Sequence, residues 1–139
     1  MTVHIRSSMY FENLLNEYFV VWQDLVMIEV RRESDNELCG FVVESGQGWN
    51  SLTVFGGLLE IHPSQKLAET HVLDVGLASL SSHWYFRSSA HDDWQICCIQ
   101  EASPSSVTIA LDYYSMPGVP IVKLNAEDFA QGAELVQEI

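Results

Sequence analysis

The fold is decided by residues 83–112, which read HWYFRSSAHDDWQICCIQEASPSSVTIALD. Three runs rich in β-branched and aromatic residues are separated here by two polar turns, a pattern that is typical of strands. No helical segment lies between the runs, and parallel strands would need long crossover connections. The sequence therefore predicts an antiparallel sheet, with strands at 83–87, 94–100 and 107–112.

Further strands are predicted on both sides of this stretch. Residues 26–31 carry apolar side chains at every second position, which is the period of a strand. The runs 38–44 and 52–61 flank a glycine-containing loop and indicate a hairpin. Gly56-Gly57 inside the second run indicates a bulge, or a place where another backbone approaches closely. Residues 65–82 fit either a strand near 70–77, which we favour, or a partly helical segment over 66–80. A further strand is expected at 119–124.

Helices are predicted at both ends of the chain. Apolar and aromatic residues recur at helical spacing over 8–24. Asn125 is a suitable cap for a final helix, with Asp128 at a position where a carboxylate is favourable. This order predicts an α+β fold: a curved, mainly antiparallel sheet of about six strands, with an N-terminal and a C-terminal helix packed on one face. Such a sheet encloses either a pocket or a filled core.

Length and composition indicate one domain and exclude several classes of protein. The chain has 139 residues, and two separate cores would each be small, so we expect a single α+β domain over 1–139. Hydrophobic residues make up 47% and charged residues 18%, which excludes a disordered polyelectrolyte and a coiled coil. A formal net charge of −13 opposes binding to phosphate backbones, so nucleic acid is not an expected partner.

The sequence predicts a cytoplasmic protein. The first residues show no basic segment followed by an apolar one, which is the pattern of a secretory signal. The most apolar stretch, 18–30, is interrupted by polar and acidic residues and is too short to cross a bilayer. The three cysteines include the adjacent pair Cys97 and Cys98, so one thiol remains after any pairing. We expect reduced, buried thiols and no association with membranes.

The sequence shows no pattern that indicates catalysis or metal binding. The histidines do not pair at H-x-x-x-H spacing, and His91 beside two aspartates is typical of an exposed polar turn. Serine is abundant, but the G-x-S-x-G motif of a nucleophile is absent. We therefore expect no metal, no cofactor and no catalytic residue. An uncharacterised small enzyme is the third of three functional alternatives.

Aromatic residues close to carboxylates are the remaining functional signal. Aromatic faces anchor protein interfaces, and beside acidic groups they also attract organic cations. Packing into a two-sided sheet core is the competing explanation for Trp84 and Trp94, whereas Trp49 stands in a glycine-flanked loop. The candidate residues for binding a partner or ligand are Trp49, Trp84, Tyr85, Asp92, Asp93, Trp94, Tyr113 and Tyr114.

The leading hypothesis is an acidic interaction module that binds a basic partner protein, steered by charge and anchored by aromatic side chains. In size and charge the chain is similar to small acidic inhibitor and immunity proteins of bacteria, a likeness of composition. The alternative is a small-molecule binding domain with an apolar aromatic pocket that prefers organic cations. Scarce charge and uncovered strand edges further predict a homodimer, formed through a strand edge or the aromatic face near Trp84.

Overall fold

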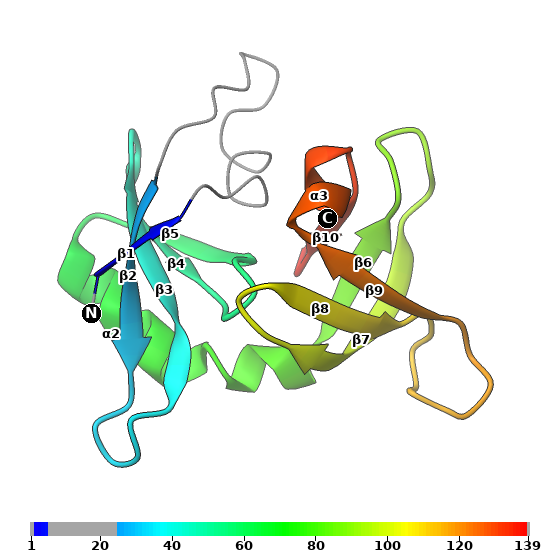
Figure 1. Ribbon diagram of the computed structural model, residues 1–139, viewed down its shortest axis with the longest axis horizontal. Coiled ribbons are helices and arrows are strands. Elements are labelled where there is room, and N and C mark those ends of the chain that lie inside the picture. Colours follow the sequence, from blue (N-terminus) through cyan, green and yellow to red (C-terminus); the bar gives the residue numbers. More distant parts are fainter. Residues whose placement is uncertain (1, 6–24, 139) are drawn as a thin grey trace.

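Two antiparallel five-stranded sheets lie side by side in the computed structural model, which describes residues 2–5 and 25–138 (Figure 1). Sheet A consists, in spatial order, of β1 (Thr2–Ile5), β2 (Leu25–Arg31), β3 (Leu38–Ser45), β4 (Gly48–Leu52) and β5 (Leu58–His62). Sheet B consists of β10 (Glu134–Val136), β6 (His83–Arg87), β7 (Gln95–Ala102), β8 (Ser106–Ala110) and β9 (Ile121–Asn125). Sheet A is thus a simple meander, whereas the last strand of sheet B returns to pair with its first.

Sheet A is buried on both faces at its centre. Residues 39–43 of β3 are all buried, in contrast to the alternation expected for a strand with one face in solvent. One face packs against Ala68 and Val72 of helix α2 (Gln65–Val75). The other face forms a second cluster with Met27 and Leu52. Helix α2 therefore covers one of the two buried faces of sheet A.

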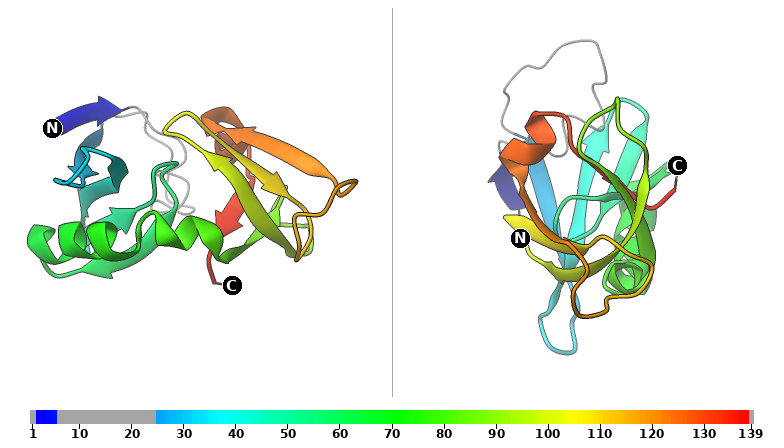
Figure 2. Two further views of the ribbon diagram at one scale, coloured as in Figure 1. Left: turned by 90° about the horizontal axis from the view of Figure 1, so that it is seen from below. Right: turned by 90° about the vertical axis from the view of Figure 1, so that its right-hand side faces the viewer.

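Helix α2 begins at a defined cap and lies very close to the sheet. The side chain of Ser64 accepts a hydrogen bond from the backbone N–H of Leu67, which satisfies one of the free donors of the first turn. A Cβ atom on Gly40 would lie 2.2 Å from a backbone oxygen, and one on Gly76 would lie 2.4 Å from another. Only glycine fits at these two contacts. Beyond α2, the 3-10 helix η1 (Ala78–Ser81) leads into sheet B (Figure 2).

The core of sheet B surrounds Trp84 on β6, whose side chain is fully buried. Its indole N–H donates a hydrogen bond of 2.9 Å to the carbonyl oxygen of Ser79, so the polar group of this large side chain is satisfied. The short helix α3 (Ala126–Ala130) begins at Asn125 with a capping box and adds Phe129 to this core. Sheet B is therefore held by apolar packing around one tryptophan.

Phe55 joins the two sheets. It lies in the turn between β4 and β5 of sheet A, yet it is 2% exposed and belongs to the hydrophobic core of sheet B. Its ring and the Trp84 ring pack in a T-shaped arrangement, with the centroids 5.4 Å apart. The turn is closed by hydrogen bonds between Thr53 and Gly57, one of which uses the threonine hydroxyl. These bonds hold the phenylalanine out toward the neighbouring sheet.

The predicted fold class is wrong in its architecture. The strands form two sheets rather than one curved sheet, and the only helix of more than five residues, among those described, lies in the middle of the chain. The run 52–61 is not one strand with a bulge: β4 ends at Leu52, the turn that carries Phe55 follows, and β5 begins at Leu58. Most of β4, including Trp49, lies where a glycine-flanked loop was expected. The prediction therefore placed the strands of sheet A and those of sheet B in a single sheet.

The predicted elements between and after the strands also need correction. Residues 70–77 were expected as a strand but belong mainly to α2, because Ala68 and Val72 are four residues apart and face the sheet together. The predicted C-terminal helix ends after five residues, since Gly132 has a φ of +114° and Leu135 enters sheet B on β10. The predicted helix over 8–24 lies outside the described residues.

The strands predicted at 26–31, 38–44, 83–87, 94–100, 107–112 and 119–124 are confirmed, with small shifts of their ends. Strand β1 has no counterpart among the predictions. Within residues 2–5 and 25–138, the structure contains no helix with the length and hydrophobicity needed to cross a bilayer.

Replacement of Phe55 by alanine should lower the free energy of unfolding by about 3–5 kcal/mol, because the buried ring is shared by both sheets. Urea unfolding followed by tryptophan fluorescence measures this loss. The control is Met116→Ala, whose side chain is 60% exposed and which should change stability by less than about 0.5 kcal/mol. Equal unfolding midpoints for Phe55→Ala and the wild type would contradict the role of Phe55.

Candidate functional site

Four polar side chains from three elements of sheet A and its helix meet at one place. Ser51 lies on β4, Glu60 and His62 lie on β5, and His71 lies on α2. Glu60 and His62 are two residues apart and so share one face of their strand. Ser51 is the cross-strand partner of Glu60, and α2 packs against both strands. Regular elements therefore position every member of this group.

Ser51 is the buried centre of the group. Its hydroxyl donates a hydrogen bond of 3.1 Å to the carbonyl oxygen of Glu60. The same oxygen lies 3.1 Å from Nε2 of His62 and 3.0 Å from Nδ1 of His71. Since a hydroxyl has one hydrogen and two lone pairs, the serine oxygen accepts from ring N–H groups of the two histidines. Ser51 thereby fixes the orientation of both imidazoles.

The Glu60 carboxylate adds a negative charge to the two rings. Its Oε2 atom lies 3.4 Å from Nε2 of His71 and 3.9 Å from Nε2 of His62, and the two ring centroids are 4.9 Å apart. Burial lowers the pKa of His62, and the nearby His71 lowers it further, while Glu60 acts in the opposite direction. The arrangement therefore favours a neutral His62 imidazole at neutral pH.

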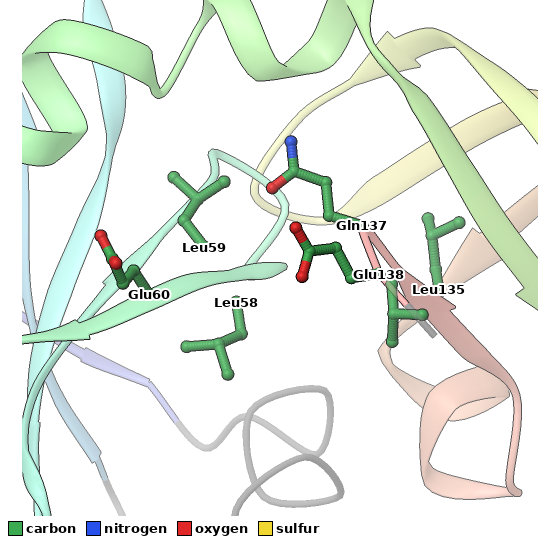
Figure 3. A pocket seen from close by; sticks show the side chains of 7 residues that line it. Leu58, Leu59, Glu60, Leu135, Gln137 and Glu138 are labelled. Atoms are coloured by element: carbon green, nitrogen blue, oxygen red, sulfur yellow. The ribbon is translucent and has the colours of Figure 1, made fainter.

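A groove runs between the two sheets beside this group, and its volume is about 470 Å³ (Figure 3). We call it the edge groove. Consecutive residues on a strand point to opposite faces, as Leu58 and Leu59 do in Figure 3. A groove that contacts both of them must follow the edge of β5 rather than one of its faces. Its lining residues are Leu58, Leu59, Glu60, Leu135, Val136, Gln137 and Glu138.

The opposite wall of the edge groove is also formed by consecutive residues of one segment. It is formed by the consecutive residues 135–138, which belong to β10 and the segment after it. A second groove, of about 430 Å³, shares Leu59, Glu60 and Gln137 with the first and is also lined by His71. Of the polar group around Ser51, Glu60 therefore lines both grooves and His71 lines the second.

The edge groove is negatively charged. Its lining contains the carboxylates of Glu60 and Glu138 and no cationic side chain. Elsewhere in the described chain, three arginines bond acidic neighbours outside the edge groove. These pairs are Arg31 with Glu29, Arg32 with Asp35, and Arg87 with Glu134.

The aromatic candidates from the sequence do not gather at one site. Trp84 is fully buried, and Trp49 is half-buried against the cluster under α2. The guanidinium of Arg87 stacks over the ring of Trp94, with the guanidinium carbon 4.2 Å from the ring centroid. Tyr85 lies half-buried on β6. Core packing accounts for the positions of Trp84 and Trp49, and stacking with Arg87 accounts for that of Trp94.

The other candidates lie on the surface of sheet B. Tyr113 stacks on His83 with ring centroids 3.9 Å apart, and Tyr114 is 66% exposed. Asp92 accepts hydrogen bonds from two serines in its own turn, which lower the pKa of its carboxyl, and Asp93 is exposed beside it. The edge groove contains none of the eight candidates. Their role in binding stays a prediction.

The residues that do meet were missed by the sequence analysis. His62 and His71 are nine positions apart, with a helix start between them, and no metal motif has this spacing. The available signal was Glu60-x-His62 at the end of the run predicted over 52–61, because an extension of that strand by one residue places two ligand-type side chains on one face. The register of β4 against β5 brings Ser51 beside Glu60, and the position of α2 brings His71 to the same place.

Comparisons with protein-family models, with curated proteins and with solved structures find no match to this chain.

The structure predicts which thiols react. Burial, and then the neighbouring Cys98, raises the pKa of Cys97 to about 12, and Cys39 is also buried. A thiol reagent applied at about pH 8 should therefore modify Cys98 alone, since the thiolate is the reactive form. Intact mass counts the labels, and the protein in denaturant, in which all three cysteines react, is the control. Rapid labelling of Cys97 in the folded protein would contradict its burial.

The pKa of His62, followed by NMR of its ring, should be lower in the folded protein than in urea, where a value near 6.5 is expected. The neutral ring is favoured by folding, so His62 contributes stability above pH 6.5 that is lost as the pH falls toward its lowered folded pKa. His62→Gln should remove this part of the pH dependence of unfolding. An unchanged pH profile in that variant would show that the histidine is not perturbed.

Proposed function

We propose that the protein binds an extended, basic segment of a partner protein in the edge groove, by addition of that segment as a strand to β5. The observation that carries this proposal is that the groove follows the edges of two strands and has a carboxylate on each wall, Glu60 on β5 and Glu138 beyond β10. The proposal gives the acidic interaction module expected from the sequence a definite place on the molecule.

Strand β5 is suited to pairing with a further strand. It stands at the end of sheet A and pairs with β4 on one side, and no other strand among the described residues pairs with its outer edge. Outer-edge N–H and C=O groups form a template for an added strand. The pairing would extend over the five residues of β5, which is an ordinary strand length.

The lining selects an alternating basic segment. The side chains of an added strand point alternately to the two faces of the sheet. Leu58, Leu59 and Val136 offer apolar contacts, whereas Glu60 and Glu138 offer partners for lysine or arginine. The net charge of −13 supports the approach of a basic protein and predicts that added salt weakens the complex.

The lining gives less support to the two other possible occupants of the edge groove, an organic cation and a second copy of this chain. An organic cation held by cation–π attraction needs aromatic faces, and the lining of the edge groove has none. A second copy of this chain would place the same groove carboxylates, Glu60 and Glu138, opposite one another across an isologous contact. A basic partner needs no aromatic faces in the groove, and its cations would lie opposite the two carboxylates.

Fluorescein-labelled heptapeptides test the proposal by fluorescence anisotropy. The peptides alternate valine with lysine, with serine or with glutamate, and only the lysine peptide should bind. Its affinity should fall by about tenfold when the salt concentration rises from about 0.05 M to about 0.3 M. N-methylation at alternate residues should abolish binding, since it removes the main-chain donors that strand pairing uses.

Matched variants locate the bound peptide. Glu138→Gln and Glu60→Gln should each weaken the lysine peptide, whereas Glu101→Gln, an exposed acid on β7, should not. The proposal is wrong if the lysine peptide does not bind, if the N-methylated peptide binds equally well, or if Glu101→Gln matches Glu138→Gln. It is also wrong if sedimentation shows a dimer that Glu138→Gln alters, because a second copy then occupies the groove.

A further inference from the structure

Three potential metal ligands converge beside the edge groove. The ligand atoms of Glu60, His62 and His71 all lie within 4.8 Å of one another, and Glu60 Oε2 is 3.4 Å from His71 Nε2. Zinc bonds of about 2.0–2.1 Å place two ligand atoms of a tetrahedral site about 3.3–3.4 Å apart. One pair already has this spacing, and the carboxylate is exposed and free to adjust.

We propose that Glu60, His62 and His71 bind a zinc ion, with water in the fourth position. Two imidazoles and one carboxylate are a donor set that zinc commonly uses. The sequence predicts no metal here, because His71 comes from a different element than Glu60 and His62. This inference goes beyond the proposed binding of a basic segment and does not depend on it.

The hydrogen bonds of Ser51 orient His71 for a cation. The serine hydrogen is committed to the Glu60 carbonyl, so the serine oxygen accepts from the Nδ1–H of His71. In the tautomer that carries its proton on Nδ1, Nε2 of His71 directs a lone pair toward the Glu60 carboxylate at 3.4 Å. A cation between these two atoms would bond to both. A hydrogen bond on the second nitrogen is also the usual support of a metal-bound histidine.

His62 completes the site through a small change. Its Nε2 atom lies 3.1 Å from the Ser51 oxygen and 3.9 Å from Oε2 of Glu60, so a modest turn of the ring moves Nε2 from the serine to a shared ion. Zinc would replace the proton on Nε2, and the neutral ring would carry its proton on Nδ1 instead. The strand that holds Glu60 and His62 does not need to move.

The fourth position faces the adjoining groove. Glu60 and His71 line this second groove of about 430 Å³, so the ion would be accessible from solvent. Three protein ligands with one open position are typical of exchangeable or catalytic zinc, whereas structural zinc is closed by four protein ligands. A zinc ion carries two positive charges, and the site supplies one carboxylate. The net charge of −13 on the protein favours binding of the remaining positive charge.

Titration of the chelator-treated full-length chain with zinc chloride tests the proposal, with a chromophoric chelator as competitor. The wild type should bind one equivalent. Glu60→Gln, His62→Gln and His71→Gln should each weaken the affinity by at least about tenfold, and Ser51→Ala by about tenfold, as expected for loss of a ligand or of its support. His91→Gln, on the turn after β6, is the matched control and should bind as the wild type does.

Cobalt and folding controls make the result decisive. Cobalt(II) should give the visible absorption of a tetrahedral site without a thiolate charge-transfer band, and thermal unfolding of the metal-free Glu60→Gln variant should match the wild type, because its side chain is 60% exposed. The proposal is overturned if zinc binds more weakly than about 100 μM. It is also overturned by a thiolate band, or by affinities in the three ligand variants that equal that of His91→Gln. The peptide titration needs no metal, so the two proposals fail separately.

Discussion

The contact between Phe55 and Trp84 determines how the two halves of the molecule are arranged. Each sheet has its own hydrogen-bonded ladder, and ladders do not extend from one sheet to the other among the described strands. The phenylalanine ring of sheet A lies instead in the core of sheet B, where burial of a large aromatic side chain contributes several kcal/mol. This contact places the edge of β5 beside β10, so the edge groove between these two strands depends on the packing of Phe55 against Trp84.

Most of the strands could be predicted from the sequence, but their division into two sheets could not. Alternation and turn residues identified the strands from 83 onward, because these signals are local. The arrangement depends on Phe55, which stands in an apolar run that also reads as a continuous strand. Helix α2 was missed because only Ala68 and Val72 are buried on it, and so short an apolar stripe gives a weak helical period. Leu135 fits a helical face and a strand equally well, and pairing with β6 decides between them.

The candidate site was less predictable than the fold. Composition pointed to a basic partner, and the acidic lining of the edge groove supports that hypothesis, but the aromatic residues singled out in the sequence lie elsewhere. Trp84 shows the difficulty, since a tryptophan that anchors an interface and one that fills a core have the same sequence pattern. The polar group around Ser51 depends on strand register and on helix placement, and both are set by tertiary contacts. A homodimer and a cytoplasmic location stay predictions.

The return of β10 to β6 sets an order of events for the folding chain. Arg87 and Glu134, which bond across this pair, are 47 residues apart in sequence, and closing so long a loop costs more entropy than forming the neighbouring hairpins of sheet B. During synthesis from the N-terminus, β5 is complete well before β10 has been made. One wall of the groove therefore exists alone for a time, and the second wall arrives only when the final strand docks. The recognition proposed above, which needs both walls, would be confined to the finished fold. Among the described strands, none pairs with the outer edge of β5 in the partly made chain, and such an edge favours association with neighbouring chains.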